Sequence, residues 1–238
     1  MLTTIKTNNR EKKQKNRENT LTKTSLLYQH VSWWLLRLFK KMPSLHSYNL
    51  TISEERKFIW YRVAKVSSRT IFDMFEKADI ILSAENTYYC HYAPNEYQDF
   101  FRFAFVRNPW DRLVSCWLDK IVGYNFYEFE EEEYAKMQDF ATFVDWVATQ
   151  DAQKIVDPHL RAQSALIDLN FVDFIGRFEN FSADFQKVMK HLGIENVEIA
   201  KKNVTKNRRP YQDYYTESTS QKVAEIYRKD IQIFNYEF

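Results

Sequence analysis

The chain has 238 residues, 45% of them hydrophobic and 17% aromatic, with a formal charge of +2 and two cysteines. This composition supports one sizeable core and excludes general disorder, and two cysteines are too few for a disulfide framework. Neither cysteine has the spacing of a metal site, so we expect free thiols in a reducing cytoplasm and no bound metal. No run of about 18 uncharged apolar residues occurs, so we expect no transmembrane helix.

Positive charge is concentrated at the N-terminus. Residues 1–24 contain seven lysines or arginines against two glutamates, which predicts a disordered basic tail. The remaining residues carry 27 basic and 30 acidic side chains. This mildly acidic balance argues against a nucleic-acid partner.

Residues 25–53 are predicted to form an amphipathic helix and a connection, and residues 54–238 the main domain. Five apolar residues share one face of the predicted helix: Leu27, Val31, Trp34, Leu35 and Leu38. Two interpretations remain open for this helix. It packs on the domain, or it docks on a partner or, in a peripheral contact of residues 1–41, on an anionic surface such as a bacterial inner membrane.

The main domain begins with a stretch whose periodicity changes in the middle. Residues 58–63 are apolar and aromatic, residues 64–68 are small or hydroxylated around Lys65, and the apolar residues that follow recur at helical spacing. This pattern predicts a strand, a tight loop and a helix. Such a loop aims backbone N–H groups and a helix N-terminus at one anion, although the glycines of the nucleotide P-loop are absent. An ordinary polar turn is the alternative.

A second corner of the same kind follows. Residues 80–82 predict a short strand and residues 83–99 an aromatic loop, and the apolar run 100–107 then predicts a buried strand that ends at Arg107. A capping asparagine and a proline predict that a helix starts directly afterwards. Arg107 therefore either faces a ligand or pairs with Asp111, one helical turn further on.

The rest of the chain continues the alternation. Helices are predicted at residues 139–147, 180–192 and 223–231, a strand at 171–178, and a basic loop at 201–210. Strands that alternate with helices predict an α/β domain, a three-layer sandwich around a central, mainly parallel sheet. Both corners would lie at the carboxyl ends of strands in such a sheet, so we expect a ligand with two anionic groups.

Several segments together resemble the carbohydrate sulfotransferase family that uses 3′-phosphoadenosine 5′-phosphosulfate (PAPS). They are YRVAKVSSRT, FAFVRNPWDRLVSCW, DPHLRAQ, FIGRFEN and the ending YYTESTSQKVAEIYRKDIQIFNY, and the resemblance covers roughly residues 58–238. It implies a P-loop-like sulfotransferase fold that transfers a sulfuryl group from PAPS, as co-substrate, to a hydroxyl of a glycan acceptor. Ala64 stands where the family usually has proline, so the first loop is less rigidly preset.

The resemblance also implies roles for individual residues. The residues implied to bind the donor are Arg62, Lys65, Val66, Ser67, Ser68, Arg69, Thr70, Arg107, Ser115, Arg208 and Arg209. His159 and Arg161 are implied to bind the acceptor, with a helix-capping role as the alternative for His159.

Two residues are predicted to carry the chemistry. In-line sulfuryl transfer needs a cation at the leaving oxygen and a base at the acceptor hydroxyl. Lys65 suits the first role. His91 suits the second, because the family commonly places a histidine or carboxylate before the buried strand, although a structural histidine is the alternative. A degenerate glycan- or nucleotide-binding module and a kinase-like phosphotransferase remain as alternative functions.

Overall fold

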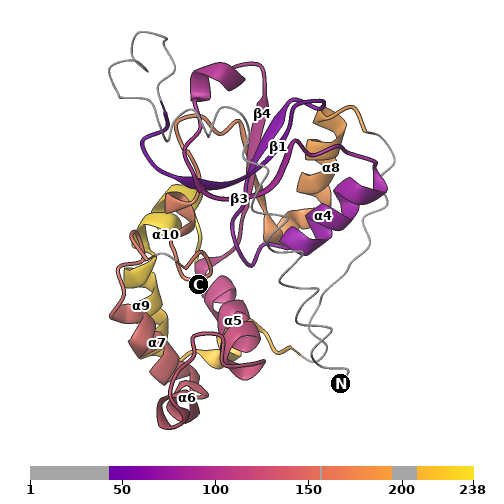
Figure 1. Ribbon diagram of the computed structural model, residues 1–238. Coiled ribbons are helices and arrows are strands. Elements are labelled where there is room, and N and C mark those ends of the chain that lie inside the picture. Colours follow the sequence, from indigo (N-terminus) through magenta and orange to yellow (C-terminus); the bar gives the residue numbers. More distant parts are fainter. Residues whose placement is uncertain (1–42, 156, 195–207) are drawn as a thin grey trace, which may run out of the picture.

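The computed structural model describes residues 43–155, 157–194 and 208–238 (Figure 1). The predicted basic tail and amphipathic helix lie outside the described residues, so membrane contact through residues 1–41 stays a prediction. In the part of the chain that is described, no helix has the length and apolar character needed to cross a bilayer.

A five-stranded sheet forms the centre of the domain, with the strand order β3-β1-β2-β4-β5 (Figure 1). The strands are β1 (Tyr48–Ser53), β2 (Phe58–Tyr61), β3 (Ala84–Cys90), β4 (Phe101–Val106) and β5 (Phe174–Arg177). β2, β4 and β5 are parallel neighbours, whereas β1 is antiparallel to both β2 and β3. The predicted α/β class is confirmed with a mixed sheet, whose three parallel strands bring their carboxyl ends to one edge.

Two predictions about the first part of the domain are wrong. Residues 48–53, expected as part of a connection, form β1, and residues 80–82 form no strand, because the strand is β3, within the predicted loop. Polar residues of β1 can be buried because they form hydrogen bonds to the segment that contains β3. Thr51 Oγ1, for example, donates to Glu85 O at 2.6 Å. β3 lies at the edge of the sheet and pairs on one side only, so it lacks the continuous apolar run of a central strand.

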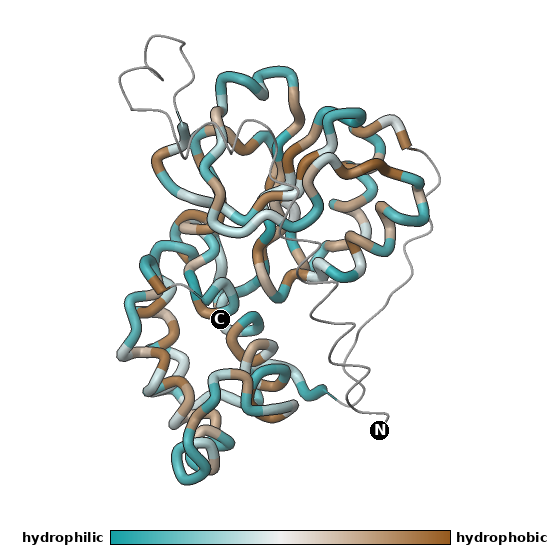
Figure 2. Tube along the Cα trace, viewed as in Figure 1, coloured by the Kyte–Doolittle hydropathy of each residue, from teal (hydrophilic) through white to brown (hydrophobic). Residues whose placement is uncertain are grey.

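Two helices cover one face of the sheet (Figure 1). They are α4 (Ser68–Lys77) and α8 (Phe181–His191). Trp60 of β2 packs edge-on against Phe75 of α4, with ring centroids 6.0 Å apart. On the opposite face, the Tyr61 hydroxyl hydrogen-bonds that of Tyr92, so the segment after β3 covers part of this side. Figure 2 shows hydrophobic residues concentrated along the central strands, as this packing requires.

The remaining helices lie beyond the carboxyl edge of the parallel strands (Figure 1). They are α5 (Pro109–Trp117), α6 (Glu131–Met137), α7 (Phe140–Ala148), α9 (Glu217–Ile226) and α10 (Arg228–Phe234). Asn108 caps α5 as expected, because its side chain accepts hydrogen bonds from the backbone N–H groups of Trp110 and Asp111. The last predicted helix is divided at Tyr227 into α9 and α10. A π-helical turn, η2 (Leu118–Val122), extends α5.

Gly176 of β5 lies directly against Phe105 of β4. A Cβ atom at position 176 would lie 2.8 Å from Phe105 Cδ1, and the Phe105 ring is fully buried. Because a packed ring has no space to move into, we expect Gly176→Ala to lower the free energy of unfolding by about 1–3 kcal/mol, as measured by chemical denaturation.

Gly193→Asn is the matched control for this prediction. A Cβ atom at Gly193 would meet nothing within 4 Å, and asparagine tolerates its positive φ of 71°. We expect a change in stability below about 0.5 kcal/mol for the control. A Gly176→Ala protein as stable as the control would contradict the close packing of β4 and β5.

Candidate functional site

The loop between β2 and α4 has the backbone of an anion cradle. Lys65 and Ser67 both have left-handed conformations, with φ of 71° and 68°. Such conformations are strained in residues other than glycine, and they turn successive N–H groups toward one side of the loop. The Ser67 side chain does not cap α4, so the first N–H groups of that helix remain for another acceptor.

The Lys65 side chain points into a small charged cluster. Its Nζ atom lies 2.9 Å from Asp119 Oδ2, and Lys120 Nζ lies 3.6 Å from the same oxygen. Burial lowers the pKa of Lys65, while the hydrogen bond to Asp119 opposes this shift. Lys65 therefore lies in a poorly hydrated position, where its charge acts strongly on a neighbouring anion.

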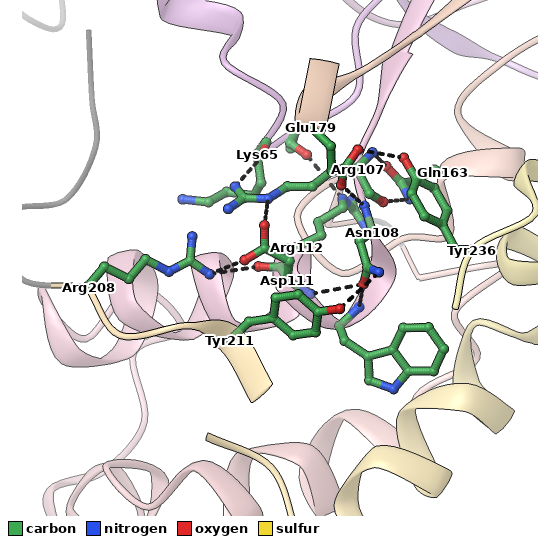
Figure 3. Close-up of polar contacts among 12 residues, drawn as sticks. Lys65, Arg107, Asn108, Asp111, Arg112, Gln163, Glu179, Arg208, Tyr211 and Tyr236 are labelled. Carbon is green, nitrogen blue, oxygen red and sulfur yellow. Dashed lines mark hydrogen bonds and ion pairs between the residues drawn. The ribbon is translucent and has the colours of Figure 1, made fainter. Parts of the chain in front are cut away.

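Arg107 makes direct contact with the loop that carries Lys65 (Figure 3). Its Nη1 atom donates to Lys65 O at 3.0 Å, and its Nε atom donates to Asp111 Oδ2 at 2.7 Å. The guanidinium also lies over the Phe178 ring, 3.9 Å from its centroid. The pairing of Arg107 with Asp111 is thus confirmed. Nη2 has no hydrogen bond to a described residue, so Arg107 keeps the N–H groups of that nitrogen for a ligand.

Arg208, in the C-terminal part of the chain, pairs with Asp111, the aspartate that Arg107 also contacts (Figure 3). Its Nη2 atom donates to Asp111 O at 3.1 Å and also pairs with the Asp111 carboxylate. Ser115 shares a helix face with Asp111, four residues earlier, and its hydroxyl has no hydrogen bond within the described residues. The structure therefore brings Arg107 and Arg208 together at Asp111, and Ser115 lies about one helical turn after that residue. Arg209 instead lies over the Tyr214 ring.

The main chain of Arg107 is held by residues that the sequence analysis missed. Gln163 Oε1 accepts from Arg107 N at 2.9 Å, and Gln163 Nε2 donates to Arg107 O at 2.8 Å. Asp230, which is fully buried, accepts from Gln163 N at 2.7 Å. Gln163 ends the DPHLRAQ segment, which is the only sequence signal for this support. Asp230 lies in the C-terminal segment of the family resemblance, but its pairing with Gln163, 67 positions away, has no local pattern in the sequence.

Arg62 does not join the charged cluster. Its Nη1 atom donates to Asn86 Oδ1 of β3 at 2.8 Å, and the guanidinium lies over the Tyr88 ring at 4.7 Å. The side chain is therefore used to attach β3 to the sheet, whereas Lys65 points to the other side of the cradle.

The two candidate bases have different neighbours. His91 Nδ1 lies 2.8 Å from Ser44 O, and His159 Nδ1 lies 2.8 Å from Asp157 Oδ1.

Arg112, another residue that the sequence analysis missed, is buried beside the loop of the first corner. Its Nε atom donates to Ala64 O at 3.1 Å and its Nη2 atom to Pro158 O at 2.7 Å. This bridge places the segment that carries His159 against the Lys65 loop.

No metal site accompanies these groups in the described part of the chain, where no three His, Cys, Asp or Glu side chains gather as ligands. The fold and site define an α/β protein that collects cationic side chains at the carboxyl edge of parallel strands.

The chain belongs to the sulfotransferase family, whose model matches residues 48–237. Over 97 residues it is 31% identical to an uncharacterized protein of Archaeoglobus fulgidus, a match that covers 39% of this chain and 67% of that protein. No solved structure matches the chain. Membership of the family supports sulfuryl transfer as the general reaction.

Proposed function

We propose that the protein transfers the sulfuryl group of PAPS to a hydroxyl of a carbohydrate acceptor. The observation that carries this proposal is the hydrogen bond from Arg107 Nη1 to Lys65 O, 3.0 Å long. Through this bond the two cationic corners become one site. A donor with a 5′-phosphosulfate and a 3′-phosphate needs two such corners at a fixed separation.

The residues present fit such a donor. The left-handed Lys65 and Ser67 and the uncapped start of α4 suit the 5′-phosphosulfate. The unbonded Nη2 of Arg107, the Ser115 hydroxyl and Arg208 suit the 3′-phosphate, because arginine binds phosphate through charge-assisted hydrogen bonds. When bound, PAPS supplies the sulfuryl group, and its 5′-phosphate is the leaving group.

Lys65 is assigned the role of stabilising negative charge on the leaving oxygen. It is a buried cation, and a cation in a site of low polarity stabilises a transition state more strongly than one in water. On binding, Lys65 would exchange the Asp119 carboxylate, its present partner, for the donor.

A carbohydrate acceptor is supported by an exposed aromatic ring next to the charged cluster. The Tyr124 hydroxyl accepts a hydrogen bond of 3.0 Å from Lys120 Nζ, and Lys120 contacts Asp119. Tyr124 is 49% exposed, so part of its side chain is open to an acceptor. An aromatic ring of this kind offers an apolar face together with a polar edge, which suits a sugar.

Transfer of labelled sulfate from PAPS to a panel of saccharides tests the proposal. We expect label in a saccharide product together with release of adenosine 3′,5′-bisphosphate. Simple phenols serve as competing acceptors, and adenosine 5′-phosphosulfate, which lacks the 3′-phosphate, serves as the control donor. Transfer to phenols alone, or no transfer from PAPS at all, would overturn the proposal.

A further inference from the structure

His159 lies beside the loop that carries Lys65, although the two are far apart in the chain. Arg112 holds them together by donating to Ala64 O at 3.1 Å and to Pro158 O at 2.7 Å. Each of these carbonyl groups belongs to the residue immediately before Lys65 or His159. Arg112 is only 2% exposed, so this link lies in the interior.

A second set of contacts connects His159 to Lys65 by another route. The Phe126 ring lies 5.4 Å from the His159 ring, and Lys120 Nζ lies 4.0 Å from the Phe126 centroid. Lys120 in turn contacts Asp119, the ion-pair partner of Lys65. The charged or titratable groups around His159 and Asp157 are Lys65, Arg112, Asp119, Lys120 and Arg161, together with Tyr89, Cys116, Tyr127 and Tyr227. His159 and Lys65 therefore belong to the same cluster.

The His159 ring is oriented as a base needs to be. Asp157 Oδ1 accepts from the His159 backbone N at 2.6 Å and lies 2.8 Å from Nδ1. With the Nδ1 proton held by this carboxylate, Nε2 is left as the proton acceptor. The side chain is 22% exposed, which leaves the ring open to a substrate. Burial lowers the pKa of His159 while Asp157 opposes the shift, so the ring is neutral at pH 7.

His91 lies in a different environment. It follows the end of β3, and β1 lies between β3 and β2 in the sheet. The ends of β2 and β3 are therefore two strand spacings apart, about 10 Å. Its Nδ1 atom is bonded to Ser44 O, in the segment before β1. His91 is therefore bonded to the segment before β1, whereas the contacts of His159 lead to Lys65.

We propose that His159 is the general base of the reaction, that Asp157 positions it, and that Arg112 fixes both against the Lys65 loop. This inference rests on the proposed sulfuryl transfer. His159 Nε2 takes the proton of the acceptor hydroxyl while the acceptor oxygen forms a bond to sulfur. The bond from sulfur to the 5′-phosphate oxygen breaks, and its electron pair stays on that oxygen, next to Lys65. The products are a sulfate ester and adenosine 3′,5′-bisphosphate.

The test compares single variants of three histidines on the full chain. We expect His159→Gln to lower kcat by about 10²-fold or more while the affinity for adenosine 3′,5′-bisphosphate changes by less than about threefold. The factor by which kcat falls in His91→Gln should be at least about tenfold smaller than in His159→Gln. The control His46→Gln should keep the wild-type rate. Calorimetry with adenosine 3′,5′-bisphosphate reports whether each variant retains a folded donor site.

A second variant tests the role of Asp157 through the pH profile. The carboxylate stabilises the protonated imidazole, so its removal lowers the pKa of His159. Because the base acts when neutral, the acid limb of kcat in Asp157→Asn should move to lower pH, and the maximal rate should fall. A residue that only supports the fold would not move this limb.

Four outcomes would overturn the proposal. A larger loss in His91→Gln than in His159→Gln would assign the base to His91. If the acid limb did not move in Asp157→Asn, the limb would not report the protonation of His159. This result can be obtained even where His159→Gln is too unstable to assay. Absence of transfer by the wild type would overturn this proposal and the proposed function together, whereas an active His159→Gln would overturn only the base.

Discussion

Replacing Lys65 by alanine is expected to lower kcat by about 10²–10³-fold while the affinity for adenosine 3′,5′-bisphosphate falls much less. Negative charge develops on the leaving oxygen only in the transition state, so the lost interaction appears mainly in turnover. Lys65 Nζ lies 2.9 Å from Asp119, and Lys120 remains 3.6 Å from that carboxylate after the substitution. The variant therefore does not leave Asp119 without a counter-ion. Initial rates with labelled PAPS and calorimetry with the bisphosphate measure the two quantities.

Lys57→Ala is the matched control for this experiment. Lys57 also has a positive φ and also pairs with an aspartate, Asp99, at 2.6 Å. Its side chain is 60% exposed, and it precedes the first residue of β2, at the opposite end of the strand from Lys65. We expect wild-type turnover in the control. Wild-type turnover in Lys65→Ala as well would remove Lys65 from the mechanism.

Replacing Arg107 by alanine is expected to remove most of the preference for a nucleotide that carries a 3′-phosphate. A charge-assisted hydrogen bond of this kind contributes about 1.5–3 kcal/mol, and each 1.4 kcal/mol is about tenfold in affinity. Wild type should therefore bind adenosine 3′,5′-bisphosphate at least about tenfold more tightly than adenosine 5′-monophosphate. Arg107→Ala should bring the two affinities close together, and Ser115→Ala should remove part of the difference. Calorimetry with both nucleotides gives the ratio directly.

Arg107 also supports the fold, so a second substitution is needed. Its guanidinium bonds to Asp111 and to Lys65 O, and burial lowers its pKa while Asp111 opposes the shift. Arg107→Lys keeps a cation for Asp111 but loses the planar donor group, and it should also lose most of the preference. Arg102→Lys changes another arginine–aspartate pair, with Asp173, and should leave the ratio unchanged. Equal wild-type affinities for the two nucleotides would contradict a 3′-phosphate site.

Predictions from the sequence were best where the signal was local. The strand before Arg107, the cap of α5 and the loop around Lys65 were all expected, because apolar runs and capping residues act over a few neighbouring positions. β1 and β3 were missed for the opposite reason. Their polar residues are stabilised by hydrogen bonds to segments more than 30 positions away, as with Thr51 and Glu85.

The amino-acid sequence by itself determined the two cationic corners, because each is a strand, a turn and a helix start formed by consecutive residues. Only the tertiary structure decided how the groups meet. Arg107 reaches Lys65 O across 42 positions, and Arg112 ties Pro158 to its own helix across 46. The same packing decides which histidine is tied to the Lys65 loop, since Arg112 holds the segment of His159 against that loop while His91 bonds to Ser44 O. Contacts of this range depend on parallel pairing and core packing, which no local pattern of residues encodes.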